Sequence, residues 1–297
     1  MSAPLATDSA DRRYVLSLGC RDRTGIVARI SGFIADLGGS IVEAGYHSDT
    51  DTGWFFTRQA VRASTLPIGM DEFGTRFADV AAELGPETDW RLHDTGEKKR
   101  IVVLVSREPH CLHDLLGRAA GGELPASIEA VIGNHRDLEP VAVAHGVPFH
   151  HVPFPRDPGE RGPAFEKVRE LVDAHDPHAV VLARFMQVLP EHLCEHWAGR
   201  AINIHHSFLP SFVGARPYHQ AFTRGVKLIA ATCHYVTAEL DAGPIIEQDV
   251  IRVDHADEVR DMVRQGRDIE KVVLARGLRW HLEDRVLVHG RKTVVFS

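Results

Sequence analysis

Short apolar runs alternate with helical segments between residues 101 and 204 of this 297-residue chain, and this alternation limits the fold more than any other feature. The runs are rich in Val, Ile, Leu and Ala, a composition typical of strands buried on both faces. They are Ile101–Val105, Ser127–Ile132, Val147–His151, Ala179–Leu182 and Ala201–Ile204. Helical segments such as Cys111–Ala119 and Phe165–His175 lie between them. The pattern predicts an α/β domain with a mostly parallel sheet, and such sheets bind ligands at the carboxyl ends of their strands.

The residues before this domain follow a different pattern, in which two amphipathic helices lie among four strands. Alternating apolar residues predict strands at Tyr14–Leu18, Ser40–His47, Trp54–Val61 and Trp90–His93. A spacing of three and four apolar positions predicts helices at Ile26–Leu37 and Met70–Leu84. The order β-α-β-β-α-β is that of a ferredoxin-like α+β domain.

A polar, charged segment without hydrophobic period separates the two patterns, so we expect the domain boundary there. The predicted organisation is a first domain at residues 1–94, a linker at 95–100 and a second domain at 101–297. Near its end, the second domain is expected to contain a long helix over Val259–Glu283 and a hairpin between Arg285 and Phe296.

Charge and composition exclude several classes of protein. The formal net charge is −7 and the isoelectric point is about 6.2, whereas a dedicated nucleic-acid binder needs a basic face. Met1–Ala10 is polar and no stretch of 18 apolar residues occurs, which predicts no membrane association and a cytoplasmic location. The four cysteines are far apart without a CxxC pair, so packed, reduced thiols are expected.

Three polar residues carry the chemistry that the sequence predicts. Asn203 and His205 are two positions apart at the end of a buried strand, so their side chains lie on one face. Asp241 follows in the segment Leu240-Asp241-Ala242-Gly243. An amide, an imidazole and a carboxylate can stabilise an oxyanion, transfer a proton and activate water, which suits hydrolysis or transfer of an acyl group. The alternative is structural: a strand-capping Asn, a solvated His and a turn Asp.

Two other motifs allow a functional and a structural interpretation. His192 and His196 with Glu195 match the H-x-x-E-H pattern of some zinc proteases, but the expected helix is short and lacks an obvious third ligand. We therefore predict no metal site, and an ordinary helix face there. The segment after the strand Ala179–Leu182 offers apolar side chains for a flat ring, or for ordinary core packing. These are Phe185, Met186, Val188 and Leu189.

The chain resembles the formyltetrahydrofolate deformylase family nearly end to end. Beyond the trio Asn203, His205 and Asp241, the resemblance rests on three stretches that flank the predicted site. They are Glu108-Pro109-His110-Cys111-Leu112-His113-Asp114-Leu115-Leu116, Leu182-Ala183-Arg184-Phe185-Met186-Gln187-Val188-Leu189 and Arg216-Pro217-Tyr218-His219-Gln220-Ala221. His206 also matches, because the related glycinamide ribonucleotide formyltransferases usually carry a proline there.

This resemblance implies a formyltransferase-like second domain that hydrolyses 10-formyltetrahydrofolate to formate and tetrahydrofolate in one-carbon and purine metabolism. Asn203 and His205 would stabilise the oxyanion, and Asp241 would assist water activation and proton transfer. No metal or organic cofactor is implied, since the folate is the substrate. The pterin would be held largely through backbone groups. The expected substrate-binding residues are Arg184, Phe185, Met186, Gln187, Val188, Leu189, Thr237, Glu239 and Leu240.

The first domain resembles an ACT domain, a module that in many proteins binds an amino acid and pairs with a copy of itself. The resemblance implies a homo-oligomer with an amino-acid effector, and Asp22 and Gly25 are the candidate effector-site residues. Arg21 and Thr24 replace the two prolines of the commoner Cys-Pro-Asp-x-Pro-Gly turn. This departure makes a different ligand preference the expectation.

Two other functions compete with hydrolysis. One is folate-dependent formyl transfer to an amine acceptor, and the other is an inactive folate-binding sensor. The segment Ser106–His110 does not resemble the phosphate-binding loop that a glycinamide ribonucleotide enzyme needs. A tRNA formyltransferase would need a basic surface, which the charge balance does not favour.

Overall fold

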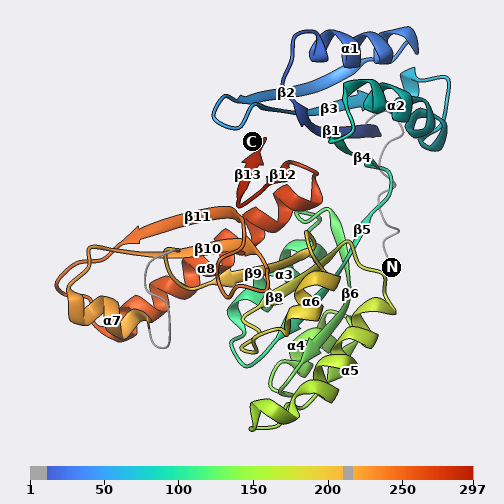
Figure 1. Cartoon of the computed structure of the whole chain (residues 1–297). Helices are drawn as coiled ribbons and strands as arrows, with labels where there is room; N and C mark the ends of the chain where they lie inside the picture. The colour runs from blue at the N-terminus through green and yellow to red at the C-terminus, as the bar shows by residue number, and fades with distance from the viewer. Residues whose placement is uncertain (1–11, 210–216, 297) are drawn as a thin grey trace. The chain divides into compact units, whose positions relative to one another are not determined.

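The computed structural model describes residues 12–209 and 217–296, which form two compact units (Figure 1). The first unit contains residues 12–98 together with 284–289 and 294–296, and the second contains the rest of the described chain. No helix within these ranges is long and apolar enough to cross a membrane.

The first unit is a four-stranded antiparallel sheet with two helices, as the sequence predicts. Its strands are β1 (Arg13–Arg21), β2 (Ile41–Asp49), β3 (Trp54–Arg62) and β4 (Asp89–Asp94). Its helices are α1 (Ile26–Asp36) and α2 (Met70–Leu84), with a short 3-10 turn η1 (Ala63–Thr65). The strand order β2-β3-β1-β4 and the chain order β-α-β-β-α-β make a ferredoxin-like fold. Leu16 and Leu18 of β1 pack with Ile30, Ile34 and Phe73 of the helices in one core.

The C-terminal hairpin corrects the predicted domain organisation. The hairpin is formed by β12 (Val286–His289) and β13 (Lys292–Val295), but most of it groups with the first unit instead of the second. The His289 ring lies 4.6 Å from the Trp54 ring, and Arg285 Nη1 lies 3.0 Å from Glu43 Oε1. Such contacts join residues more than 200 positions apart, so local composition could not reveal them.

The predicted linker is also partly wrong, because its last two residues belong to a strand. The strand β5 (Lys99–Val105) begins inside the segment 95–100 and pairs in parallel with β6 (Ala126–Gly133) from Lys99 onward. Strand pairing uses backbone groups, so two basic side chains do not prevent it.

The second unit is built on a seven-stranded sheet with the order β11-β10-β9-β8-β5-β6-β7. Its remaining strands are β7 (Phe149–His151), β8 (Ala179–Ala183), β9 (Ala201–His205), β10 (Leu228–Tyr235) and β11 (Ile245–Arg252). The helices are α3 (His110–Ala120), α4 (Glu139–Ala144), α5 (Gly162–Asp173), α6 (Glu191–His196), α7 (Pro217–Arg224) and α8 (Val259–Leu282), with a 3-10 turn η2 (Pro158–Glu160). Strands β5 to β9 are parallel, and β10 and β11 run antiparallel to their neighbours. The predicted mostly parallel α/β sheet is therefore confirmed.

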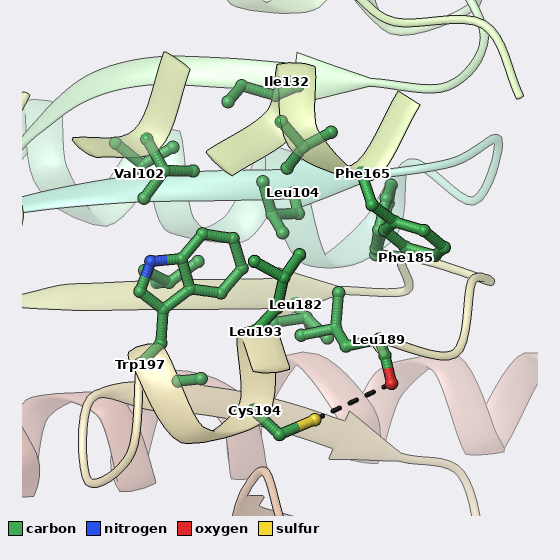
Figure 2. Packing of buried hydrophobic residues seen from close by; sticks show 14 of the residues in the cluster. Val102, Leu104, Ile132, Phe165, Leu182, Phe185, Leu189, Leu193, Cys194 and Trp197 are labelled. Carbon is green, nitrogen blue, oxygen red and sulfur yellow. Dashed lines mark hydrogen bonds between the residues drawn. The ribbon is translucent and has the colours of Figure 1, made fainter. Parts of the chain in front are cut away.

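Helices cover both faces of this sheet, with α3 and α8 together on one face and α5 and α6 on the other (Figure 1). On the second face, Trp197 follows α6 and lies fully buried against strand residues such as Val102 and Leu104 (Figure 2). The thiol of Cys194 lies 3.7 Å from the Leu189 carbonyl oxygen, which ties α6 to the segment that follows β8 (Figure 2).

The order of the strands determines where a ligand can bind. From β5 the chain proceeds outward through β6 and β7, then returns to the other side of β5 as β8 and β9. The helices after β5 and β8 thus depart in opposite directions, and this leaves a crevice at the carboxyl ends of the central strands. Ser106 follows β5 at this edge, and its Oγ accepts a hydrogen bond of 3.0 Å from the Met186 N–H after β8.

Candidate active site

A cavity of about 610 Å³ lies at the carboxyl ends of β8 and β9, within the size range of small-molecule sites. One part of its lining is apolar and the other is polar. The apolar part includes Phe185, Met186, Val188, Leu189, Val236 and Leu240. The polar part includes Glu108, His110, Arg184, Asn203, His205, His206, Tyr218, His234, Asp241, Arg267 and Glu270.

The structure brings the predicted trio together in this cavity. Asn203 and His205 lie two positions apart at the end of β9, so their side chains project from the same face of the strand. His205 Nδ1 lies 3.4 Å from Asp241 Oδ2. The two side chains are only 9% and 15% exposed, so solvent screens their interaction weakly. The pKa of Asp241 is lowered by the hydrogen bond from His205 and by nearby histidines, which outweigh burial. The carboxylate is therefore ionised at neutral pH.

The loop after β10 holds Asp241 in place through an unusual backbone conformation. Asp241 has φ 53°, a left-handed conformation that Asp tolerates better than most residues. A Cβ at Gly243 would lie 1.8 Å from the Tyr235 carbonyl oxygen, so only glycine allows the loop to fold back onto β10. The Asp-Ala-Gly segment is thus a turn, as in the structural interpretation, and it also directs a carboxylate toward His205.

His234 is a site residue that the sequence did not predict. Its Nδ1 lies 2.9 Å from the Tyr235 carbonyl oxygen, which can only accept, so Nδ1 carries the proton. Its Nε2 then accepts from the Asn203 amide at 3.2 Å, and it lies 3.9 Å from Asp241 Oδ1. Burial lowers the pKa of His234, which keeps the ring neutral and able to accept. This contact turns the NH₂ group of Asn203 toward His234.

Ser207 contacts the other nitrogen of the His205 ring. Its Oγ lies 2.7 Å from His205 Nε2, so the imidazole stands between Asp241 and a hydroxyl group. Ser207 is 5% exposed and is not among the described residues that line the cavity. The hydroxyl can orient the ring, but it does not face the space that a substrate would occupy.

A buried carboxylate organises the polar part of the cavity. Glu270 of α8 is 1% exposed, receives a hydrogen bond of 2.7 Å from the Tyr218 hydroxyl and lies 2.9 Å from His110 Nε2. Arg184 Nε lies 3.5 Å from the same carboxylate. Burial alone would raise the pKa of Glu270, but the hydrogen bond from His110 and the charge of Arg184 lower it. The group is ionised and held by three residues from three segments.

The predicted substrate segment lines the cavity, and its side chains divide between two roles. Phe185 and Leu189 are buried in the core on the α6 side, whereas Met186 and Val188 are 56% and 63% exposed. Arg184 and Gln187 also line the cavity, as do Thr237 and Leu240 from the loop after β10. Core packing therefore accounts for Phe185 and Leu189, and the slot for a flat ring stays a prediction for Met186 and Val188.

Glu239 differs from the other predicted substrate-binding residues. It is not among the described lining residues, and its side chain is 71% exposed with Oε2 3.5 Å from Arg291. Its carbonyl oxygen accepts a hydrogen bond of 3.0 Å from Thr237 Oγ1. Glu239 thus shapes the loop with its backbone while its carboxylate points to solvent.

The two histidines of the candidate zinc motif have other partners. His192 Nε2 lies 2.9 Å from Glu166, and His196 Nε2 lies 2.9 Å from Asp173, so the two rings contact different acids of α5. A separate group of His110, Cys111 and Glu270 has potential ligand atoms within 4.8 Å of one another. There, burial raises the pKa of the Cys111 thiol, and the Arg184 cation lies against the same carboxylate. Both effects oppose a bound cation.

In the first unit, the candidate effector residues lie in an exposed turn. Gly25 is the N-cap of α1 with φ 94°, a conformation that favours glycine. The Asp22 N–H donates to the Gly53 carbonyl oxygen at 2.9 Å, which fixes the turn against the β2–β3 connection. Each of these groups shapes the turn, and the Asp22 carboxylate is exposed.

A mostly parallel sheet with a cavity at its strand ends is typical of α/β enzymes, and a formyl transferase family model that matches residues 99–278 shows the class to which this one belongs. Formyltetrahydrofolate deformylase from Corynebacterium sp. is 44% identical over 95% of this chain and 98% of its own length. The one from Bacillus subtilis is 43% identical over 98% and 96%. A crystal structure of a formyltetrahydrofolate deformylase from Pseudomonas syringae pv. tomato has 57% identity and a TM-score of 0.93, with 96% and 95% of the two chains covered.

The chain belongs to the formyl transferase family and, within it, to the formyltetrahydrofolate deformylases. The chain is also similar to transferases of this family. The crystal structure of glycinamide ribonucleotide transformylase 1 from Symbiobacterium toebii has 30% identity and a TM-score of 0.63, and covers 70% of this chain and 98% of its own. Proteins with this fold therefore include both deformylases and transformylases.

Proposed function

We propose that this enzyme hydrolyses 10-formyltetrahydrofolate to formate and tetrahydrofolate, in one-carbon and purine metabolism. The observation that carries the proposal is the convergence of Asn203, His205 and Asp241 in one cavity, with 3.4 Å between His205 Nδ1 and Asp241 Oδ2. The names of the relatives support the substrate. The apolar part of the cavity, between Met186 and Leu240, is the place for the pterin, where backbone groups of both loops can bind its polar edge.

Asn203 is placed to stabilise the oxyanion. One N–H of its amide donates to His234, which leaves the second N–H to donate to the formyl oxygen as negative charge develops there. An oxyanion donor of this kind contributes about 3 kcal/mol to lowering the barrier. Because His234 is neutral and its acceptor nitrogen is fixed, the amide needs no reorientation during the reaction.

His205 and Asp241 divide the proton transfers. Ionised Asp241 assists removal of a proton from the attacking water, directly or through His205. As the formyl C–N bond breaks, the leaving nitrogen N10 takes up a proton, and the water oxygen remains on carbon as formate. His205 lines the cavity, so its ring can assist Asn203 in stabilising the oxyanion once it has gained a proton, while its Nε2 stays in contact with Ser207.

The contact between His205 and Ser207 raises a second mechanism, in which serine attacks the formyl carbon. An Asp that contacts a His, which in turn contacts a Ser, is the arrangement of a nucleophilic triad. Ser207, however, is buried and lies outside the described cavity lining, whereas the formyl group must lie inside the cavity. Direct attack by water fits this arrangement better.

Two further parts of the proposal concern cofactors and the first unit. Both hydrolytic groups and the oxyanion donor are side chains of this chain, so the reaction needs no metal or organic cofactor. We also propose that the first unit binds an amino-acid effector at the turn of Asp22 and Gly25 and joins two copies of the chain.

The test is release of formate from 10-formyltetrahydrofolate with purified protein and no amine present. We expect stoichiometric formate and tetrahydrofolate, with turnover reduced at least about 10²-fold in Asn203→Ala and unchanged in His192→Ala as the control. Formate or formamide that forms only after addition of an amine would indicate a transferase. Folate binding without any turnover would indicate a sensor.

A further inference from the structure

A cluster of polar side chains closes one side of the cavity, and we call it the polar wall. It consists of His110 at the start of α3, Arg184 after β8, His206 after β9, Tyr218 of α7 and Glu270 of α8. Each member contacts another member. Arg184 Nη1 lies 2.6 Å from His206 Nδ1, and the remaining contacts meet at the carboxylate of Glu270. Five segments that are distant in sequence therefore form one connected unit.

The polar wall stands directly beside the proposed catalytic imidazole. The ring of His206 lies 5.1 Å from the ring of His205 and 6.1 Å from the ring of Tyr218, measured between centroids. A molecule that approaches the formyl carbon from this side therefore contacts Arg184 and His206 next to the His205 ring.

The polar wall is internally neutralised. The charge of Glu270 offsets that of Arg184, and burial together with Arg184 lowers the pKa of His206 to about 4. The His206 ring is thus uncharged, so its Nδ1 accepts from Arg184. A charged or strongly polar molecule would therefore find few free hydrogen-bonding groups on this surface. Arg184 Nε and His110 Nδ1 are the buried polar atoms of the wall without a hydrogen-bond partner among the described residues.

Arg184 occupies its place at a conformational cost. Its φ is 62°, a left-handed conformation that costs a residue with a Cβ about 1 kcal/mol and costs glycine nothing. Strain of this kind persists where the side chain has a role at a site. The position of the Tyr218 side chain is limited by a close contact, because a Cβ at Gly266 of α8 would lie 2.0 Å from its hydroxyl oxygen. The close approach of α8 holds the tyrosine against Glu270.

We infer that the polar wall determines the acceptor of the formyl group, admitting water and excluding amines. This inference rests on the proposed hydrolysis. In both outcomes the formyl C–N10 bond breaks; a new C–O bond to water gives formate, and a new C–N bond to an amine gives a formamide. The polar groups of the wall are bound to one another, so an amine finds few free groups that could hold its substituents and direct its nitrogen at the formyl carbon. Water has no substituents to be held and does not need such a surface.

The native protein gives the first test, with 10-formyltetrahydrofolate and increasing glycinamide as a small primary amine. We expect formate at an unchanged rate and formylglycinamide below about 1% of the formate. Substantial formylglycinamide from the native protein would overturn the inference. If formate forms without amine, the proposed hydrolysis still stands; if it does not, the proposed function itself fails.

The second test opens the wall with Arg184→Gly, which removes the side chain and suits φ 62°. The ratio of formylglycinamide to formate is expected to rise about tenfold or more. Asp176→Gly is the matched control, because Asp176 also has a left-handed φ of 41° but lies outside the cavity lining. His206→Ala removes the next member of the wall and gives the same readout if Arg184→Gly does not fold.

A native ratio in both folded variants would overturn the inference. If neither variant folds, the glycinamide titration of the native protein decides alone. A raised ratio in the control as well would show that relief of backbone strain, and not the opened wall, changes the products.

Discussion

Replacing Asp241 by asparagine tests the charge at the proposed site with almost no change in volume. Asp241 Oδ2 lies 3.4 Å from His205 Nδ1, and both side chains are largely buried. At an effective dielectric constant of about 20, a carboxylate at this distance stabilises a protonated imidazole by about 5 kcal/mol. The variant loses this stabilisation in the transition state, where the imidazole gains positive charge.

A loss of 1.36 kcal/mol slows a reaction tenfold, so the full interaction corresponds to between about 10³- and 10⁴-fold in kcat. We expect KM to change by less than about threefold, since Asp241 interacts with the transition state more than with bound folate. The assay is steady-state release of formate, with folate-analogue binding and thermal unfolding as checks on the folded state.

The control is Asp176→Asn, which makes the same substitution at another left-handed aspartate, 87% exposed and paired with Arg100. It should retain native kinetics. A second comparison uses His205→Gln, in which the effect of Asp241→Asn should largely disappear because the two residues act together. Native turnover in Asp241→Asn would refute the reasoning.

Four other predictions follow from the same geometry. His234→Leu should lower kcat about tenfold with little change in KM, because it frees the Asn203 amide; a change in KM alone would contradict this role. Ser207→Ala should retain kcat within about threefold, whereas a loss near 10³-fold would support attack by serine. Urea unfolding should show a lower free energy of unfolding in acid. The pKa of His206 is about 4 in the folded protein and about 6.5 in the unfolded chain, so between these values the unfolded state binds the extra proton. Stability therefore falls as the pH decreases from about 6.5 to about 4. The loss at pH 4 is on the order of 3 kcal/mol, and a flat profile would argue against the buried neutral ring. Turnover should survive chelators and His192→Ala; loss with a chelator and rescue by zinc would revive the metal interpretation.

Local pattern was sufficient for most of the fold. The apolar spacing of Met70–Leu84 predicts α2 with its observed bounds, and the buried runs predict β5 to β9 within a few residues. These elements are apolar on one or both faces, so their period is visible in the sequence. The strands β10 and β11 were missed, because polar residues interrupt their apolar ones, such as Thr232 and His234 in β10 and Glu247 and Asp249 in β11.

The sequence predicted which three polar residues would converge in one cavity, but not the residues around them. Asn203 and His205 share a strand, so alternation alone places them together. His234 could be assigned only after β10 was known to pair with β9, where it lies opposite Asn203. Glu270 lies within a helix rich in charged residues, and its inward direction follows only from the packing of α8.

A structure with a non-hydrolysable 10-formyl folate analogue tests the central claim most directly. The carbonyl oxygen that replaces the formyl oxygen should lie about 3 Å from Asn203 Nδ2, with the carbonyl carbon facing Asp241 and His205. A carbonyl group directed toward Met186 or Leu240, beyond hydrogen-bond distance of all three polar side chains, would contradict the proposed mechanism.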